Sequence, residues 1–219
     1  MELLLIRHAL PLRVETRDGS AADPALSPVG REQARRLAAW LAGEHVDALY
    51  TSPLRRARET AAPLERSFGL RARVEPGVRE YDAERDHYIP LEELKAQDPA
   101  AWRAFVSGGM YEGIDRDAFE RGVVGSLETI AAAHRGERVA VVCHGGVINV
   151  WAAHVLGLGP TPFFEPLYTS VSRFLAASSG ERSVASLNEA SHLRAQALRD
   201  AAAPPQGADG DALADGGAM

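Results

Sequence analysis

The sequence RVAVVCHGG occupies residues 138–146, and its apolar first half is the clearest buried-strand pattern in the chain. A short apolar run bounded by turn residues is typical of a strand that is covered on both faces. After the glycine pair, the residues follow a helical period up to Leu156. A strand that leads directly into a helix is typical of parallel sheets covered by helices, so we expect this architecture here.

Two further strand-then-helix units precede this one. Apolar runs of strand length occur at residues 3–6 and 46–50. A Ser-Pro pair follows each run, at residues 27–28 and 52–53, and serine is a preferred helix cap while proline is tolerated in the first turn. The helix after the first pair ends in a glycine stop at Gly43. Its apolar stripe is formed by Ala34, Leu37, Ala38 and Leu41.

The remaining pattern completes an α/β alternation. A helix ends near residue 135, and residues 171–176 and 183–187 supply further strand patterns. Sequential alternation of strands and helices favours helices on both faces of one sheet. The expected fold class is therefore α/β, as a three-layer α/β/α sandwich with a mostly parallel central sheet.

The chain is expected to form one main domain, residues 1–194. Within it, residues 78–122 lose the strand and helix alternation, and we interpret this segment as an inserted lobe that lies over the site. Residues 195–219 are rich in Ala, Gly, Asp and Pro, a composition that cannot bury enough apolar surface to order itself. They are predicted to be a disordered tail.

Composition excludes several classes of partner. Of the 219 residues, 46% are hydrophobic and 25% are charged, and the net charge of −6 argues against a nucleic-acid or acidic-membrane binder. The single cysteine, Cys143, cannot form an intramolecular disulfide, which favours a cytoplasmic location. The apolar run at residues 3–6 is too short for a signal peptide or a membrane span.

Charged and nucleophilic residues follow the three predicted strands. Arg7 and His8 follow the first, residues 52–56 the second, and residues 144–146 the third. Ligands of parallel sheets gather beyond the carboxyl ends of the strands, where helix amino ends also favour anions. A phosphate group, with about −1.5 to −2 charges at neutral pH, is the natural ligand for such an edge.

Each residue alone has a simpler interpretation. A single histidine after a strand is more often a hydrogen-bonded structural residue than a catalyst. Likewise, the arginines at positions 55, 56 and 58 could be one solvated helix face. The functional interpretation depends on all three groups meeting at one edge of the sheet.

Three motifs in this order resemble the signatures of the histidine phosphatase superfamily, whose best-known members are cofactor-dependent phosphoglycerate mutases. They are LIRH at residues 5–8, SPLRRARETA at residues 52–61 and VCHGG at residues 142–146. The resemblance extends over most of the chain up to the predicted tail. One departure is Ala9, which stands where the family usually has a glycine after the first histidine. We therefore do not carry over the family's substrate contacts from this loop.

The resemblance implies a metal-independent phosphomonoesterase without a cofactor, acting on a small phosphate monoester, with a homodimer as a weaker expectation. By analogy His8 would be the phosphorylated nucleophile. Glu80 matches the position of the family's proton donor, although other carboxylates lie near it in the sequence, namely Glu75, Asp82 and Glu84. The expected phosphate-binding residues are Arg7, Arg56, His144 and Gly145.

The chemistry is physically reasonable with these residues. Two guanidiniums and an imidazolium can neutralise a phosphoryl group, a task often given to magnesium. His8 must present an unprotonated nitrogen, so its other nitrogen should donate to a carbonyl or a similar acceptor. The proton donor is subject to opposing effects, because nearby arginines lower the pKa of Glu80 whereas burial raises it.

Other functions fit less well. The longer segments of the mutases are not found, so hydrolysis is preferred over mutase-type phosphoryl transfer, and a non-catalytic module that binds phosphorylated ligands or a protein is the third alternative. A cysteine phosphatase would need an arginine where Asn149 stands. Neither a Gly-x-Ser-x-Gly elbow nor a zinc-binding pattern occurs.

The sequence does not identify the substrate. Aromatic and imidazole side chains in the predicted lobe could line a pocket and favour a ring-bearing substrate, although such residues more often serve packing. They are Tyr81, His87, Tyr88, Trp102 and Tyr111.

Overall fold

The computed structural model describes residues 1–106, 109, 113–159 and 163–193. Its main sheet has six strands in the order β4-β3-β6-β1-β7-β8. The strands of this sheet are β1 (Glu2–Arg7), β3 (Ala48–Thr51), β4 (Arg73–Val74), β6 (Arg138–Cys143), β7 (Val171–Ala176) and β8 (Arg182–Glu189). A separate antiparallel pair joins β2 (Val14–Glu15) to β5 (His87–Tyr88).

The main sheet is mostly parallel, as predicted. Strand β6 pairs in parallel with both β1 and β3, and β3 pairs in parallel with β4. The last two strands form an antiparallel hairpin, in which β7 lies beside β1. Strand β3 begins at Ala48 rather than at the predicted Val46, because its pairing with β6 starts where Ala48 lies opposite Val139.

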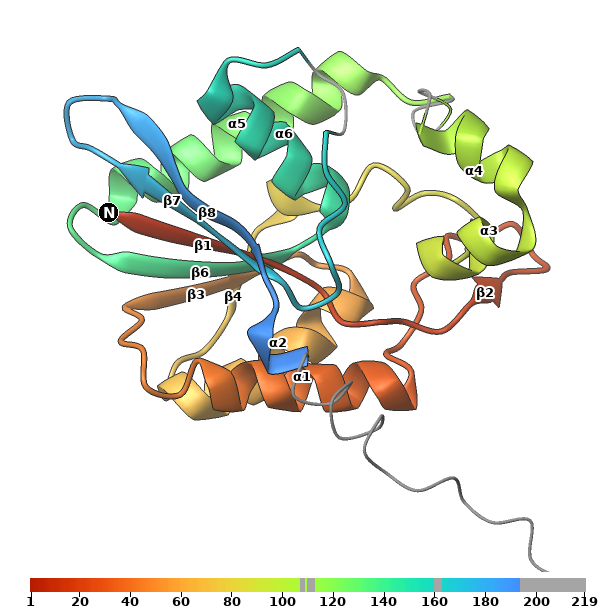
Figure 1. The fold of residues 1–219 in the computed structure, drawn as a ribbon, viewed down its shortest axis with the longest axis horizontal. Helices are drawn as coiled ribbons and strands as arrows, with labels where there is room; N and C mark the ends of the chain where they lie inside the picture. Colours follow the sequence, from red (N-terminus) through yellow and green to blue (C-terminus); the bar gives the residue numbers. More distant parts are fainter. Residues whose placement is uncertain (107–108, 110–112, 160–162, 194–219) are drawn as a thin grey trace, which may run out of the picture.

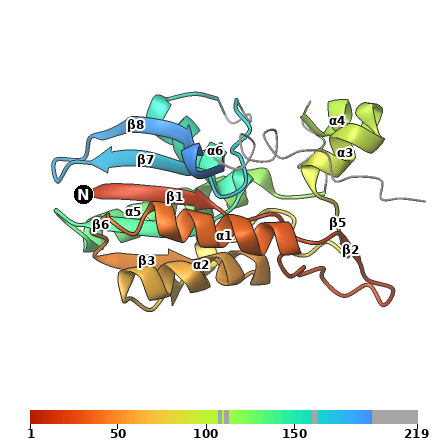
Figure 2. The ribbon, with the colours of Figure 1, turned by 60° about the horizontal axis from the view of Figure 1, so that its bottom comes forward.

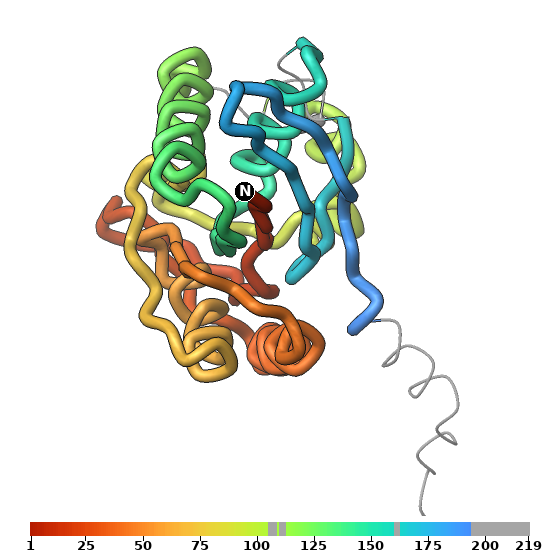
Figure 3. Tube along the Cα trace, turned by 90° about the vertical axis from the view of Figure 1, so that its left-hand side faces the viewer, coloured from red at the N-terminus to blue at the C-terminus, as the bar shows by residue number. Residues whose placement is uncertain are grey.

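Helices cover both faces of this sheet (Figures 1 and 3). One face carries α1 (Pro28–Trp40) and α2 (Arg55–Phe68), and the other carries α5 (Arg116–Ala133) and α6 (Gly145–Leu156). Side chains of β1 alternate between the two cores: Leu4 and Ile6 pack with α1 and α2, and Leu3 and Leu5 with α5 and α6. Strand β6 alternates in the same way, and the three-layer α/β/α sandwich is confirmed.

The two Ser-Pro pairs behave differently. Ser27 caps α1, since its hydroxyl oxygen accepts a hydrogen bond from the backbone N–H of Gly30. Helix α1 ends at Trp40, before Gly43, but the predicted stripe is buried. The cap predicted at Ser52 is wrong: α2 begins at Arg55 and has no side-chain cap, because Ser52 lies two residues too early.

The predicted lobe contains short elements that lie beyond the carboxyl ends of the parallel strands (Figure 2). They are β5, α3 (Leu91–Gln97) and α4 (Pro99–Val106), whereas η1 (Pro76–Val78) lies mostly before the predicted boundary at residue 78. Helix α5 already begins at Arg116, inside the range expected for the insertion, because Asp115 caps it by accepting from the N–H of Ala118. The predicted tail, residues 195–219, lies outside the described residues. No helix among the described residues is long and apolar enough to span a membrane.

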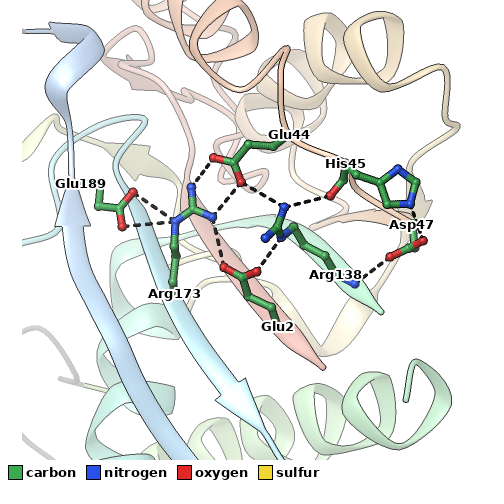
Figure 4. A network of polar contacts seen from close by, with 7 residues as sticks. All are labelled: Glu2, Glu44, His45, Asp47, Arg138, Arg173 and Glu189. Atoms are coloured by element: carbon green, nitrogen blue, oxygen red, sulfur yellow. Dashed lines mark hydrogen bonds and ion pairs between the residues drawn. The ribbon is translucent and has the colours of Figure 1, made fainter. Parts of the chain in front are cut away.

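A network of ion pairs links β1 and β6 to the hairpin of β7 and β8 (Figure 4). Arg173 of β7 donates to Glu2 of β1, to Glu44 and to Glu189 of β8. Arg138 of β6 donates to Glu2 at 2.6 Å. This network therefore links the amino ends of β1 and β6 to the hairpin.

Candidate active site

Two buried histidines face each other at the carboxyl end of the sheet. His8 follows β1 and His144 follows β6, and the parallel register that sets Arg7 opposite Cys143 brings the next residues together. The two imidazole rings have centroids 5.0 Å apart and are tilted by 57°. Their exposures are 3% for His8 and 0% for His144, so any ligand that touches both is removed from bulk water.

A backbone contact fixes the tautomer of His8. Its Nδ1 lies 2.8 Å from the carbonyl oxygen of Ala9, which can only accept, so Nδ1 carries the proton and Nε2 keeps its lone pair. Burial, and then the positive charges of Arg56 and Arg7, hold the pKa of His8 well below its usual value. The ring is therefore neutral and presents an unprotonated nitrogen, as the sequence analysis required.

Ser52 orients the second histidine. Its hydroxyl oxygen accepts from the backbone N–H of Leu54 at 3.3 Å and lies 2.8 Å from Nε2 of His144. When the hydroxyl donates its proton to Nε2, the ring proton of His144 lies on Nδ1. That Nδ1 is buried and has no hydrogen-bond partner among the described residues.

His144 is not the imidazolium that the sequence analysis assumed. Burial, followed by the charges of Arg56, His8 and Arg7, holds the pKa of His144 well below its usual value. In the free protein the ring is consequently neutral, and the tautomer with the proton on Nδ1 offers an anion one N–H donor. The positive charge of the site comes from the arginines.

Arg7 and Arg56 are buried guanidiniums on either side of the histidines, with exposures of 3% and 1%. Arg7 donates to the carbonyl of Pro166 at 2.5 Å and lies over the ring of Tyr168, 3.8 Å from its centroid. Arg56 donates to Asp82 at 2.9 Å. The Nε atoms of both arginines are buried and have no partner among the described residues, so each guanidinium retains donor capacity.

The neighbouring arginines of α2 have the simpler role considered above. Arg55 is exposed and pairs with Glu59, and Arg58 is exposed. Only Arg56 of this run turns into the site. Gly145, the first residue of α6, lies beside Arg7, since a Cβ built on it would come 3.8 Å from the Arg7 Nε.

Glu80 is a buried carboxyl group with two backbone donors. The N–H of Gly146 donates to its Oε2 at 2.9 Å, and the N–H of Tyr81 to its Oε1 at 3.2 Å. Burial and then the charge of Asp82 raise the pKa of Glu80 to about 7, against the opposing effects of these donors and of Arg56. Burial thus outweighs the arginine, and near neutral pH the group can both hold and release a proton.

The other carboxylates near Glu80 in the sequence lie in different surroundings. Glu75 caps η1 and also accepts from Ser126. Glu84 is exposed and forms an ion pair with Arg79. Arg79 is therefore the partner of Glu84 and not of Glu80. Of the four, only Glu80 and Asp82 line the cavity that His8 lines, and His144 lies behind His8 without being part of that lining.

This cavity has a volume of about 370 Å³. Its lining includes the predicted residues Tyr81, His87, Tyr88 and Trp102, and Tyr111 lies outside the described residues. Among the described residues, no group of three or more His, Cys, Asp or Glu side chains is arranged to hold a metal ion. Cys143 is buried, and burial raises the pKa of its thiol.

Several residues of the site were missed from the sequence. Ser52 belongs to a motif that the sequence did reveal, but its contact with His144 crosses between strands. Residues 163–166, which line the cavity, and Tyr168, which packs against Arg7, come from a segment without strand or helix pattern, and no sequence signal marked them as part of the site.

Comparison with known proteins agrees with this geometry. The histidine phosphatase superfamily (branch 1) matches residues 3–190. Phosphoglycerate mutase-like protein 4 of Arabidopsis thaliana is 31% identical over 158 residues, 68% of each chain. Phosphoserine phosphatase 1 of Hydrogenobacter thermophilus is 29% identical over 175 residues, which cover 75% of this chain and 81% of that protein.

Solved structures share the fold. Bacillus stearothermophilus YhfR has a TM-score of 0.71 at 25% identity and covers 88% of this chain and 98% of its own. A phosphoserine phosphatase of Entamoeba histolytica has a TM-score of 0.67 at 23% identity, with 88% and 98% covered. The match to the family extends over nearly the whole described chain and includes the strands that carry both buried histidines. The chain belongs to the histidine phosphatase superfamily.

Proposed function

We propose that this protein hydrolyses a small phosphate monoester through a phosphohistidine formed on His8. The observation that carries the proposal is the unprotonated Nε2 of a buried His8, in one cavity with Arg7, Arg56 and a carboxyl group whose pKa is about 7. Relatives that are named phosphoserine phosphatases also support hydrolysis as the reaction.

In the first step, Nε2 of His8 attacks the phosphorus atom, and the bond between phosphorus and the ester oxygen breaks. The lone pair forms the new N–P bond, and the ester oxygen takes the proton of Glu80 as it leaves. Arg7 and Arg56 neutralise charge on the other phosphoryl oxygens through their free Nε–H donors, and Nδ1–H of His144 supplies a third donor.

In the second step, water attacks the phosphohistidine. Glu80, now a carboxylate, accepts a proton from that water, and the N–P bond breaks to return the lone pair to Nε2. Inorganic phosphate leaves, and Glu80 is protonated again. A carboxyl group with a pKa of about 7 suits both steps, because near neutral pH each protonation state is accessible at little cost.

Release of phosphate from p-nitrophenyl phosphate by the purified protein tests the proposal. His8→Ala is expected to abolish turnover, whereas His45→Ala, which changes an exposed histidine far from the cavity, should keep it. Brief incubation with labelled substrate should yield an acid-labile phosphoenzyme in the wild type and none in His8→Ala.

The same experiment separates the alternatives. Transfer of the label to a sugar acid in preference to water would indicate a mutase. Binding of phosphate esters without turnover would indicate a non-catalytic module. Turnover that survives His8→Ala would contradict the proposed nucleophile.

A further inference from the structure

The cavity has two chemically distinct ends. Around His8 it is polar and charged, as described above. The other end is lined by residues of α3 and α4 and by residues 163–166, and Lys95 of α3 reaches Glu165 in this last segment. The side chains lining that end are almost entirely apolar, namely Ile89, Leu91, Leu94, Trp102, Phe163 and Phe164.

Side chains of α6 and β8 hold one wall of this apolar end in place. Asn149 donates from its amide to the carbonyl of Phe164 at 3.1 Å and accepts from the N–H of Phe163 at 3.1 Å. Asn188 likewise accepts from the N–H of Leu167 at 2.7 Å and donates to the carbonyl of Glu165 at 3.0 Å. These bonds make the wall a pre-formed surface, which lowers the entropy cost of binding a ligand there.

Arg7 connects this wall to the phosphate end. The same guanidinium that lies beside the histidines donates to the carbonyl of Pro166, within the wall segment. A phosphoryl group held by Arg7 therefore lies near the segment that carries the two phenylalanines.

The charges near the apolar end do not favour an anionic substituent. Glu165 lines the cavity and pairs with Lys95 of α3 at 3.9 Å. Asp82 lines it as well and pairs with Arg56. Arg85 also lines the cavity and could attract a carboxylate, but it shares the lining with both acidic residues. A second carboxylate would meet repulsion as well as attraction, and it would lose water against apolar walls.

We propose that the preferred substrate is a phosphate monoester whose leaving group is uncharged and ring-bearing, rather than a small one that carries a carboxylate, such as serine or glycerate. This inference rests on the proposed function for the position of the phosphate. The ring would lie against Trp102, Leu94 and the two phenylalanines, and its burial would supply the selectivity.

Binding of three primary-alkyl esters to the His8→Ala protein tests this inference without turnover. The esters are 2-phenylethyl phosphate, n-propyl phosphate and O-phosphoserine, and titration calorimetry gives the affinity of each. We expect 2-phenylethyl phosphate to bind about tenfold or more tightly than either of the others, since even one methylene in a matching pocket can contribute that much. Equal affinities, or tighter binding of O-phosphoserine, would overturn the inference.

Variants of the wall locate the source of the preference. Trp102→Ala and Leu94→Ala, each combined with His8→Ala, should reduce the preference for the phenylethyl ester to about threefold or less while n-propyl phosphate binds as before. Leu175→Ala is the matched control, because Leu175 is an exposed leucine of β7 outside the cavity. A preference that survives both wall variants would contradict the proposed ring site.

The two proposals can fail separately. If the wild type turns over none of the esters but the binding preference is present, the hydrolytic function is wrong and the ring site stands. If hydrolysis depends on His8 but O-phosphoserine has the highest kcat/KM, the function stands and the proposed leaving group is wrong.

Discussion

Replacement of Glu80 by glutamine should remove the alkaline limb of the pH profile. The carboxyl pKa of about 7 means that half of the free protein holds this proton at pH 7. The protonated fraction then falls about tenfold for each further pH unit. Because kcat/KM reports the ionisation of the free enzyme, the wild type should lose activity above a midpoint near pH 7. Glutamine has no proton to lose, so the variant should show no such limb.

The size of the loss should depend on the leaving group. For an alkyl phosphate the leaving alkoxide needs a proton, and loss of a general acid typically costs about 10²- to 10⁴-fold in rate. For p-nitrophenyl phosphate the loss of rate should be much smaller, since nitrophenolate is stable enough to leave without a proton. Initial rates with both substrates from pH 5 to 9 give this comparison directly.

The same substitution should stabilise the protein at alkaline pH. A glutamate whose pKa rises from the ordinary 4.5 to about 7 on folding is penalised for ionising, by about 3 kcal/mol once the pH exceeds the folded pKa. The sign follows from the raised pKa, because the folded state binds the proton more tightly and therefore loses stability as the pH rises from 4.5 to 7. Glutamine escapes this penalty but loses one backbone contact worth about 1 kcal/mol.

Urea unfolding should therefore show Glu80→Gln to be more stable than the wild type by about 2 kcal/mol at pH 8, with the advantage vanishing towards pH 5. Glu84→Gln is the control, since Glu84 is an exposed glutamate four residues away, and it should change neither profile. An alkaline limb that persists in Glu80→Gln, together with a pH-independent stability difference, would refute the reasoning.

Three further substitutions test other parts of the structure. Ser52→Ala removes the hydroxyl that orients His144, and it should lower kcat/KM about tenfold or more while the Tm changes little; an unchanged rate would show that the contact is dispensable. Gly146→Ala introduces a Cβ 2.3 Å from Oε1 of Glu80, so the carboxyl group must move. We therefore expect kcat/KM for alkyl esters to fall about 10²-fold or more. An alkaline limb identical to that of the wild type would contradict the displacement of Glu80. Arg173→Met breaks the network of Figure 4 and should lower the free energy of unfolding by about 1 to 3 kcal/mol without changing kcat/KM; equal stability in urea would contradict it.

The sequence alone determined the sandwich and the position of the histidines. The apolar runs at residues 3–6 and 138–142 predict two buried parallel strands, and their carboxyl ends place His8 and His144 at one edge of the sheet. These predictions succeeded because strand periodicity and parallel pairing are local and regular properties.

Only the tertiary structure decided how these groups are protonated and which residues complete the cavity. The pKa of Glu80 depends on burial and on Asp82, and the neutral state of His144 depends on burial and on the charges of Arg56 in α2 and of groups at the end of β1. Ser52 was misassigned as a helix cap because its partner is 92 positions away in the chain. Desolvation and Coulomb interactions depend on distances in space, and no local pattern of residues encodes those distances.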